Sequence, residues 1–213
     1  MAFNNNTRGT RTTYFTVAEG KVRVRLKEAT EGSVARQNKK GEIVHEFVYD
    51  EFTGRVAAIT VDEASFGTQW RIDFEDNGER YTLNMMYDSS AAQKLLNVLL
   101  APELDVTKPV TLRPYNFTND KGKQIVGVTV LQNGSKLAPA YGTHAYPIDG
   151  RPEMPELEVV KFKGKDQYDS TKRLEFLAEQ VATRLRPKLT AQIAQPVESV
   201  PTVDEGGSDE LPF

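Results

Sequence analysis

Residues 88–101, DSSAAQKLLNVLLA, are the stretch on which the fold prediction rests, because they form the helical pattern inside a series of strand-like segments. Asp88, Ser89 or Ser90 can cap the N-terminus of this helix, and Pro102 stops it. The sequence on either side reads as β-strands. The helix therefore divides the strands into an earlier and a later group.

Strand-like patterns cover residues 20–27, 42–49, 55–61, 68–75 and 79–87 before the helix, and 109–118 and 123–131 after it. Asn77-Gly78 and Asn119-Asp120-Lys121-Gly122 mark turns between neighbouring strands. Strands, a helix and then two strands is the order of an OB-fold, a partly open five-stranded barrel whose helix lies between strands three and four. The sequence predicts a mainly β, elaborated OB-fold barrel, although other small barrels fit the pattern.

A second helix is predicted at about residues 170–186, where apolar side chains recur at helical spacing until Pro187 ends the pattern. Residues 189–213 show no periodicity and are predicted to be disordered. The predicted organisation is a binding domain at 1–188, which includes this additional C-terminal helix, followed by a tail at 189–213.

The charge of the chain is divided unevenly. Residues 189–213 hold five acids and no Lys or Arg, so they carry −5, and the net charge of −3 leaves +2 for residues 1–188. A mildly basic body with an acidic tail favours a polyanionic partner and a tail that mimics it, although plain solubility explains the same split. The 213 residues contain no cysteine, no apolar run of membrane-spanning length and no secretory signal, so we expect a cytoplasmic protein.

Residue patterns typical of enzymes are missing from the sequence. His45 and His144 are its two histidines, and neither has metal-ligand spacing. The cluster Asp73–Glu79 is similar to the start of a calcium loop, but the twelfth position is Asn84 where a glutamate is needed. We therefore predict no catalytic residues, no metal site and no cofactor. A nuclease that uses scattered carboxylates and Mg²⁺ stays open as an alternative.

Basic and aromatic side chains alternate along several strands. A site for single-stranded nucleic acid needs both types, cations for the phosphates and ring faces for the bases. In residues 20–27 the cations share one strand face, and Val22, Val24 and Leu26 share the other. The candidate DNA-binding residues are Lys21, Arg23, Arg25, Arg36, Lys39, Lys40, Tyr49, Trp70, Arg71, Arg80, Tyr81, Arg113, Tyr115, Phe117, Lys121 and Lys123.

These candidates have structural alternatives. The basic face of residues 20–27 also suits a solvated sheet edge. The patterns around Trp70 and Tyr81 favour core packing over base stacking. Tyr115 and Phe117 share one face of their strand, so they form either a stacking platform or part of the core.

The chain ends in Leu211-Pro212-Phe213 behind an acidic run. This terminus resembles that of single-stranded DNA-binding proteins of bacteria and their phages, in which acids precede an aliphatic residue, Pro and a terminal Phe. The matching residues are Asp209, Glu210, Leu211, Pro212 and Phe213. Gly206-Gly207-Ser208 interrupts the acids, which departs from the bacterial pattern. The body is more similar to the phage proteins.

The resemblance implies an OB-fold that coats single strands during phage DNA replication, recombination and repair, in the cytoplasm of a host cell. It also implies that the tip recruits proteins of those processes. We include Asp204 and Glu205 in the partner-binding tail, and we expect the tethered acids to compete with DNA for the basic groove. A protein–protein adaptor that acts only through the tail is the other alternative.

Overall fold

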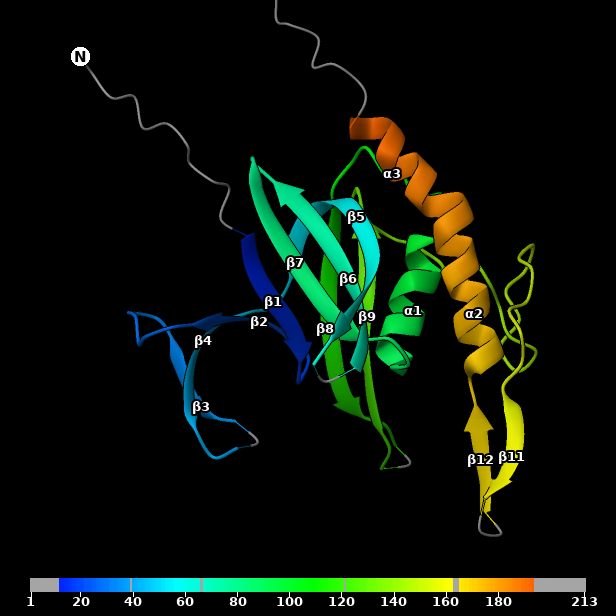
Figure 1. Ribbon diagram of the computed structural model, residues 1–213, viewed down its shortest axis with the longest axis horizontal. Coiled ribbons are helices and arrows are strands. Elements are labelled where there is room, and N and C mark those ends of the chain that lie inside the picture. Colours follow the sequence, from blue (N-terminus) through cyan, green and yellow to red (C-terminus); the bar gives the residue numbers. More distant parts are fainter. Residues whose placement is uncertain (1–11, 39, 66, 121, 163–164, 194–213) are drawn as a thin grey trace, which may run out of the picture.

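The computed structural model describes residues 12–38, 40–65, 67–120, 122–162 and 165–193 (Figure 1). Its strands are β1 (Thr12–Ala18), β2 (Lys21–Leu26), β3 (Val34–Gln37), β4 (Ile43–Tyr49), β5 (Phe52–Ala64), β6 (Gly67–Asp76), β7 (Glu79–Met86), β8 (Val110–Thr118), β9 (Gln124–Gln132), β10 (Ser135–Lys136), β11 (Glu158–Phe162) and β12 (Lys165–Asp169). The first ten form one mixed sheet in the order β10-β9-β8-β5-β6-β7-β1-β2-β4-β3. The predicted mainly β fold is confirmed.

The middle of the sheet is the antiparallel meander β5-β6-β7. Trp70, Ile72 and Phe74 alternate along β6 and are buried together, because a strand points successive side chains to opposite faces. Asn77 and Gly78 join β6 to β7 with φ angles of 48° and 80°, as a tight hairpin requires. The predicted Asn-Gly turn is confirmed.

Helix α1 (Ser90–Leu99) follows β7 and packs against the sheet. The hydroxyl of Ser89 caps it by accepting a hydrogen bond from the backbone N–H of Ala92 at 3.2 Å. The apolar face of the helix is buried in the core through Leu95, Leu96 and Leu99. The helix predicted within residues 88–101 is confirmed.

Strand β1 joins two parts of the sheet, because it pairs in parallel with β7 and antiparallel with β2. The turn after β1 contacts β8, and a Cβ on Gly20 would lie 2.9 Å from the backbone nitrogen of Asn116. Since β1 and β8 are not neighbours in the sheet, this contact means that the sheet curls. No hydrogen-bonded pairing within the described residues joins β10 to β3, so the sheet stays open where a barrel was predicted.

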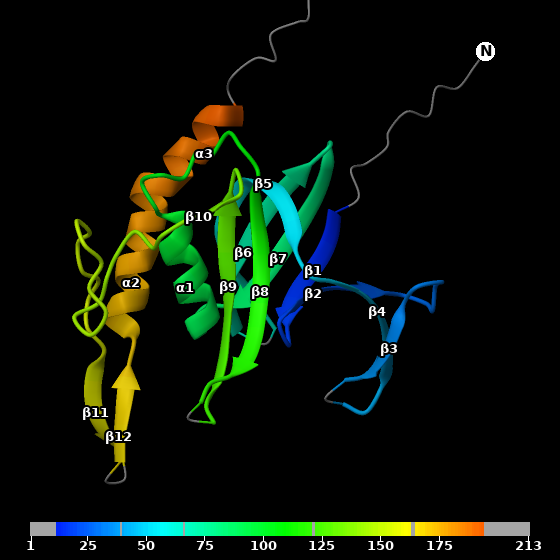
Figure 2. The ribbon, with the colours of Figure 1, turned by 180° about the vertical axis from the view of Figure 1, so that it is seen from behind.

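Strands β2, β4 and β3 form an arm that extends from the curled body (Figure 1). In both ribbon views the arm lies on the opposite side of the molecule from the C-terminal helices and the β11–β12 hairpin (Figure 2). Its connection to the body runs through the β1–β2 ladder. The arm can therefore form one wall of a binding site, with the body as the other wall.

The C-terminal segment runs as α2 (Thr171–Gln180), a π-helical turn η1 (Val181–Leu185) and α3 (Arg186–Ile193). Pro187 lies inside α3, so the prediction that it ends the helix was wrong. In a regular α-helix the proline ring clashes with a carbonyl one turn earlier and offers no N–H to bond it. Here the Arg186 N–H reaches back to the Val181 carbonyl, and this wider turn carries the chain past the proline.

One apolar stripe fixes this helical segment to the body. Its buried members are Leu174, Leu177, Val181, Leu185 and Leu189. The Nε of Arg186 donates a hydrogen bond to the Ile59 carbonyl on β5 at 2.8 Å, and Arg55 Nη1 donates to Gln192 Oε1 at 2.6 Å. The folded body therefore includes all of α3, although the tail was predicted to begin at residue 189.

Strands β11 and β12 form a separate two-stranded sheet that projects from the start of α2 (Figure 2). The sequence analysis assigned no strands to this segment. Its exposed face carries Val159 opposite Tyr168, at 58% and 70% exposure.

No helix in the described ranges has the length and apolar character that crossing a bilayer requires.

Candidate nucleic-acid interface

A cleft of about 980 Å³ opens between the arm and the body. The aromatic residues that line its walls are Tyr14, Phe15, Phe47, Tyr49, Phe52 and Tyr81. Of these, Tyr14 points its side chain to the other face of β1 from Phe15, the face it shares with Thr82 of β7. Tyr14 and Tyr49 are about half exposed, at 56% and 48%. The rings of Phe52 and Tyr81 lie 5.2 Å apart between centroids, and those of Phe47 and Tyr49 lie 6.3 Å apart. Aromatic faces of this kind stack on bases of any sequence.

The register between β2 and β4 sets the outer wall of the cleft. Val22 pairs with Tyr49 and Val24 pairs with Phe47, so all four side chains share one face of the sheet. Val22 is buried in the body. Where the two strands leave the body, the same face is uncovered, and the apolar alternation that builds the core continues as the cleft wall.

Arg25 and Lys27 are the basic residues at the cleft. Arg25 pairs with Glu46 across the β2–β4 ladder, so its side chain leaves β2 on the face opposite the wall formed by Val24 and Phe47. Both basic residues are exposed, and within the described residues neither side chain has a hydrogen-bond or ion-pair partner. The lining also holds the acids Glu28, Glu51 and Asp76. Cations at the margin of an aromatic cleft suit a phosphate backbone whose bases lie in the cleft.

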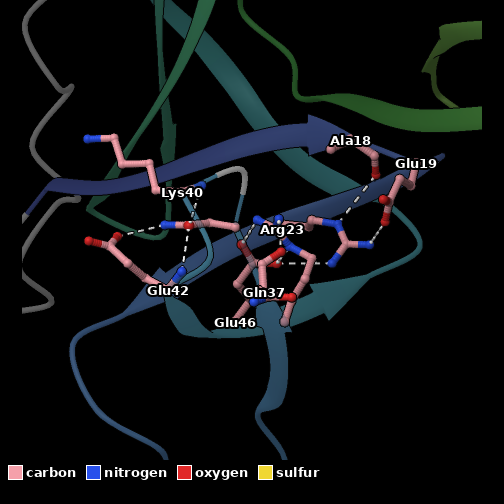
Figure 3. Close-up of polar contacts among 9 residues, drawn as sticks. Ala18, Glu19, Arg23, Gln37, Lys40, Glu42 and Glu46 are labelled. Carbon is pink, nitrogen blue, oxygen red and sulfur yellow. Dashed lines mark hydrogen bonds and ion pairs between the residues drawn. The ribbon is translucent and has the colours of Figure 1, made fainter.

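Arg23 and Arg36, both predicted to contact DNA, are instead held by one carboxylate of the arm. Glu46 is buried at 4% exposure on the face of β4 opposite the cleft wall. Arg23 Nη1 donates to its Oε2 at 3.0 Å, and Arg36 donates through Nη2 to Oε1 at 2.6 Å and through Nε to Oε2 at 3.1 Å (Figure 3). These contacts join β2, β4 and β3, so both arginines have a structural role that the sequence did not predict.

The two guanidinium groups also set the protonation of Glu46. The hydrogen bond from Arg36 lowers the pKa of Glu46 below its ordinary value, and the hydrogen bond from Arg23 acts in the same direction against the cost of burial. The same contact with Glu46 raises the pKa of Arg36. The Glu46 carboxylate therefore stays ionised at neutral pH and keeps its hydrogen bonds with Arg23 and Arg36.

Other predicted cations also carry carboxylate partners. Lys21 pairs with an aspartate, as does Arg71, and Arg80 and Arg113 pair with glutamates. Arg80 and Tyr81 are adjacent on β7, so they point to opposite faces, and Arg80 points away from the cleft that Tyr81 lines. Exposed ion pairs of this type are weak, so these side chains can still leave their carboxylate partners and bind phosphate.

The prediction that Trp70 contacts DNA is wrong, because its ring is buried. It is 1% exposed, its indole stacks on Tyr87 at 5.1 Å between centroids, and its Nε1 donates to the Tyr87 carbonyl at 3.3 Å. The ring is therefore not available to a base. Tyr81 is half-buried, and its hydroxyl donates to Glu79 at 2.6 Å, a bond that together with burial raises the pKa of Tyr81 to about 12.

Tyr115 and Phe117 form a pair on the outer face of β8, with centroids 5.9 Å apart. Phe117 is 54% exposed, and Tyr115 is half-buried over Gly127, where a Cβ would lie 2.3 Å from the Tyr115 hydroxyl oxygen. The pair is a surface platform and not core. It lies beside the Gly20 turn rather than within the cleft lining.

The remaining predicted cations lie at turns. Lys40 and Lys123 are exposed and lie outside the cleft lining. The backbone N–H of Lys40 donates a hydrogen bond to Asn38 Oδ1 (Figure 3). Lys39 and Lys121 lie outside the described residues, as do Asp204, Glu205, Asp209, Glu210, Leu211, Pro212 and Phe213.

The cleft residues that were not predicted from the sequence include Tyr14, Phe47 and Lys27. Tyr14 was missed because residues 12–18 were not assigned as a strand, although TTYFTVA carries β-branched and aromatic residues typical of one. Phe47 shares the strand face of Tyr49 at a spacing of two, and Lys27 ends the basic alternation of β2. All three carried a readable signal.

No metal centre is evident in the described ranges, where no group of three or more His, Asp or Glu side chains lies close enough to hold an ion. Comparison with known proteins found no matching family model, no matching curated protein and no matching solved structure. The cleft with its aromatic lining and the sequence of the tail are therefore the features of this chain that point to a function.

Proposed function

We propose that this chain binds single-stranded DNA without sequence preference, in the cleft between the arm and the body. The observation that carries the proposal is the set of aromatic rings in the cleft, with Lys27 in its lining and Arg25 on the far face of the same strand, both without an ion-pair partner among the described residues. Rings supply stacking faces that tolerate any base, and cations neutralise phosphates. The proposed role is that of a phage-type protein that coats and protects single strands during DNA replication, recombination and repair.

The order of elements supports an OB-type body. If β5, β6, β7, β8 and β9 are numbered one to five, helix α1 falls between three and four, which is the OB-fold order. In this interpretation β1 to β4 are an N-terminal addition, and β1 extends the sheet beside β7. The binding cleft then lies where the addition meets the body, at an edge of the curled sheet.

The tail supplies the second part of the proposal. Residues 209–213 combine two acids with Leu-Pro-Phe, and we propose that they recruit replication, recombination or repair proteins. The five acids beyond residue 188 also lie on a tether, so their effective concentration near the cleft is high and they compete with DNA. No cofactor or metal is needed for either part.

The test is fluorescence anisotropy of a labelled single strand, titrated with the full-length chain at several salt concentrations. Tyr49→Ala removes a half-exposed ring, and stacking of about 1–3 kcal/mol per base predicts roughly 5-fold to 150-fold weaker binding. Arg25→Ala is expected to reduce the salt slope by about 0.7. Tyr168→Ala and Lys136→Ala remove an exposed ring and an exposed cation far from the cleft and serve as matched controls.

Each alternative predicts a different outcome of the same titration. Wild-type affinity in both cleft variants would move the site away from the cleft. An absence of binding by the full-length chain at low salt, and by a chain ending at Val203, would favour the adaptor. Loss of the labelled strand only when Mg²⁺ is present would favour the nuclease.

A further inference from the structure

A second cavity of about 500 Å³ lies between α1, the segment 143–157 and α2. It is on the side of the molecule away from the arm, since α1 and α2 lie opposite β3 and β4 in both ribbon views (Figures 1 and 2). No residue is shared between its lining and that of the DNA cleft. We call it the helix pocket.

The helix pocket combines an apolar floor with a basic rim. Apolar contact surface comes from Ala145, Tyr146, Met154 and Leu157. The basic side chains in the lining are Lys94, His144 and Arg173, and the single acid there is Glu156. Tyr146 is 81% exposed, so an apolar ring stands uncovered at the mouth.

Arg173 is the fixed point of this rim. Its Nε donates to the Pro155 carbonyl at 3.0 Å, which orients the guanidinium at the start of α2. Within the described residues its Nη atoms have no hydrogen-bond or ion-pair partner. The half-buried guanidinium of Arg173 can therefore bind a carboxylate, and its two Nη atoms allow a bidentate contact.

The C-terminal tip of this chain has the complementary chemistry. Phe213 supplies an aromatic ring, and Leu211-Pro212 adds apolar surface. Asp209 and Glu210 add two negative charges directly upstream. The helix pocket, with three basic side chains against one acid, matches the tip better than the DNA cleft, which has two cations against three acids.

The length of chain after α3 allows the tip to reach the pocket. Arg173 and the end of α3 at Ile193 lie on one helical segment, and a rise of 1.5 Å per residue separates them by about 30 Å. The roughly 20 residues that follow span at most about 70 Å. The chain can therefore return along α3 and α2 and place Phe213 at Arg173 without strain.

We propose that the tip, residues 209–213, docks in the helix pocket of its own chain, with the Phe213 ring on the apolar floor and the carboxylates on Arg173, Lys94 and His144. A partner protein must then displace the tip from this seat before it is recruited. While the tip is docked, the tail acids are held away from the DNA cleft, and release of the tip delivers them to it. The docking step itself does not depend on DNA binding.

The test uses the full-length chain, which has no cysteine, so Ser208→Cys creates a unique site for a nitroxide spin label. In the ¹⁵N-labelled protein without DNA, docking predicts at least 3-fold loss of amide peak intensity around Lys94 and Ala145, relative to amides of β3 and β8. Phe213→Ala and Lys94→Glu in the labelled chain are each expected to restore those intensities. Lys136→Glu, an exposed lysine on β10, is the matched control and leaves the broadening unchanged.

Three outcomes overturn the proposal. The first is unbroadened amides around the pocket, and the second is broadening that persists in Phe213→Ala. The third is equal broadening in a mixture of ¹⁵N chain without label and labelled chain without ¹⁵N, which places the tip in a second copy. Because the experiment contains no DNA, its result is independent of the anisotropy titration.

Discussion

At the scale of single residues, Glu46 determines whether the arm holds its shape. A buried carboxylate is costly unless it is paired and hydrogen-bonded, and here two arginines from neighbouring strands satisfy both of its oxygens. The arm has little core of its own, because Val44 is its other buried position beyond the β1–β2 ladder. This ionic group therefore substitutes for apolar packing between β2, β4 and β3.

Glu46→Gln should destabilise the arm in a pH-dependent way. Because the folded-state pKa of Glu46 is lowered from 4.5, its stabilising contribution is complete above that pH and is lost as the pH falls through the lowered value. We expect the substitution to cost about 1–3 kcal/mol at pH 7, since Arg36 is partly exposed and the pair is partly screened. Denaturant unfolding and amide exchange of β3 and β4 measure this.

The matched control for this prediction is Glu42→Gln, an exposed acid directly before β4 whose carboxylate accepts a hydrogen bond from Asn38. It should change the free energy of unfolding by less than about 0.5 kcal/mol at any pH. A Glu46→Gln difference that is the same at pH 3 and pH 7 would contradict the ionic account.

Residue roles were predictable only in part, because strand faces follow from alternation whereas ionic partners follow from register. The alternation of β2 was readable, and so were the hairpin at Asn77-Gly78 and the buried face of Trp70. The pairing of Arg23 with Glu46 depends on which strand lies beside β2 and at what offset. Sequence spacing does not carry that information, so cations reserved for structure were counted as phosphate ligands.

At the scale of elements, the C-terminal helical segment shows how a local rule is overridden. Pro187 predicts a helix end, yet the stripe that includes Leu185 and Leu189 remains buried on both sides of it. Burial of a fully enclosed leucine contributes about 1.5–3 kcal/mol, enough to favour a widened turn over termination. The π-helical turn Val181–Leu185 is the local cost of keeping that stripe in contact.

Leu189→Ala tests whether α3 belongs to the folded body. Leu189 is 3% exposed and part of the core cluster, so its truncation should lower the free energy of unfolding by about 2–4 kcal/mol. Lys188→Ala, the exposed neighbour, should cost less than about 0.5 kcal/mol. Equal melting temperatures for the two variants would show that the body ends before Leu189, as the sequence alone indicated.

Elements with strong local signals were predicted and weakly patterned ones were not. The helix at Ser90–Leu99 has a capping serine and an apolar face, and β8 and β9 flank a turn signal. By contrast, β11 and β12 make a hairpin that stands outside the main sheet, with both Val159 and Tyr168 exposed. Without a buried face there is no alternation of burial to read.

At the scale of the whole molecule, the acidic tail and the proposed DNA cleft belong to one chain, and salt screens the charges of both. A chain ending at Val203 is expected to bind single-stranded DNA more tightly at low salt, with an altered salt slope, because the competing acids are gone. Anisotropy titrations at several salt concentrations measure both quantities.

The control retains the length of the tail and removes its charge, through Asp204→Asn, Glu205→Gln, Asp209→Asn and Glu210→Gln together. It should reproduce the effect of truncation if charge is the cause. Unchanged low-salt affinity in the truncated chain would remove competition from the proposed function and leave recruitment as the role of the tail.

The parallel ladder between β1 and β7 has a consequence for the kinetics of folding. Thr12 pairs with Arg80, so the first described strand cannot find its place until β5, β6 and β7 have formed their hairpins. Pairings between distant segments pay a larger loop-closure entropy and form late. In pulsed hydrogen exchange during refolding, amides of β1 and of the arm should gain protection after those of β6, and the protein passes through a stage that has a body but no cleft.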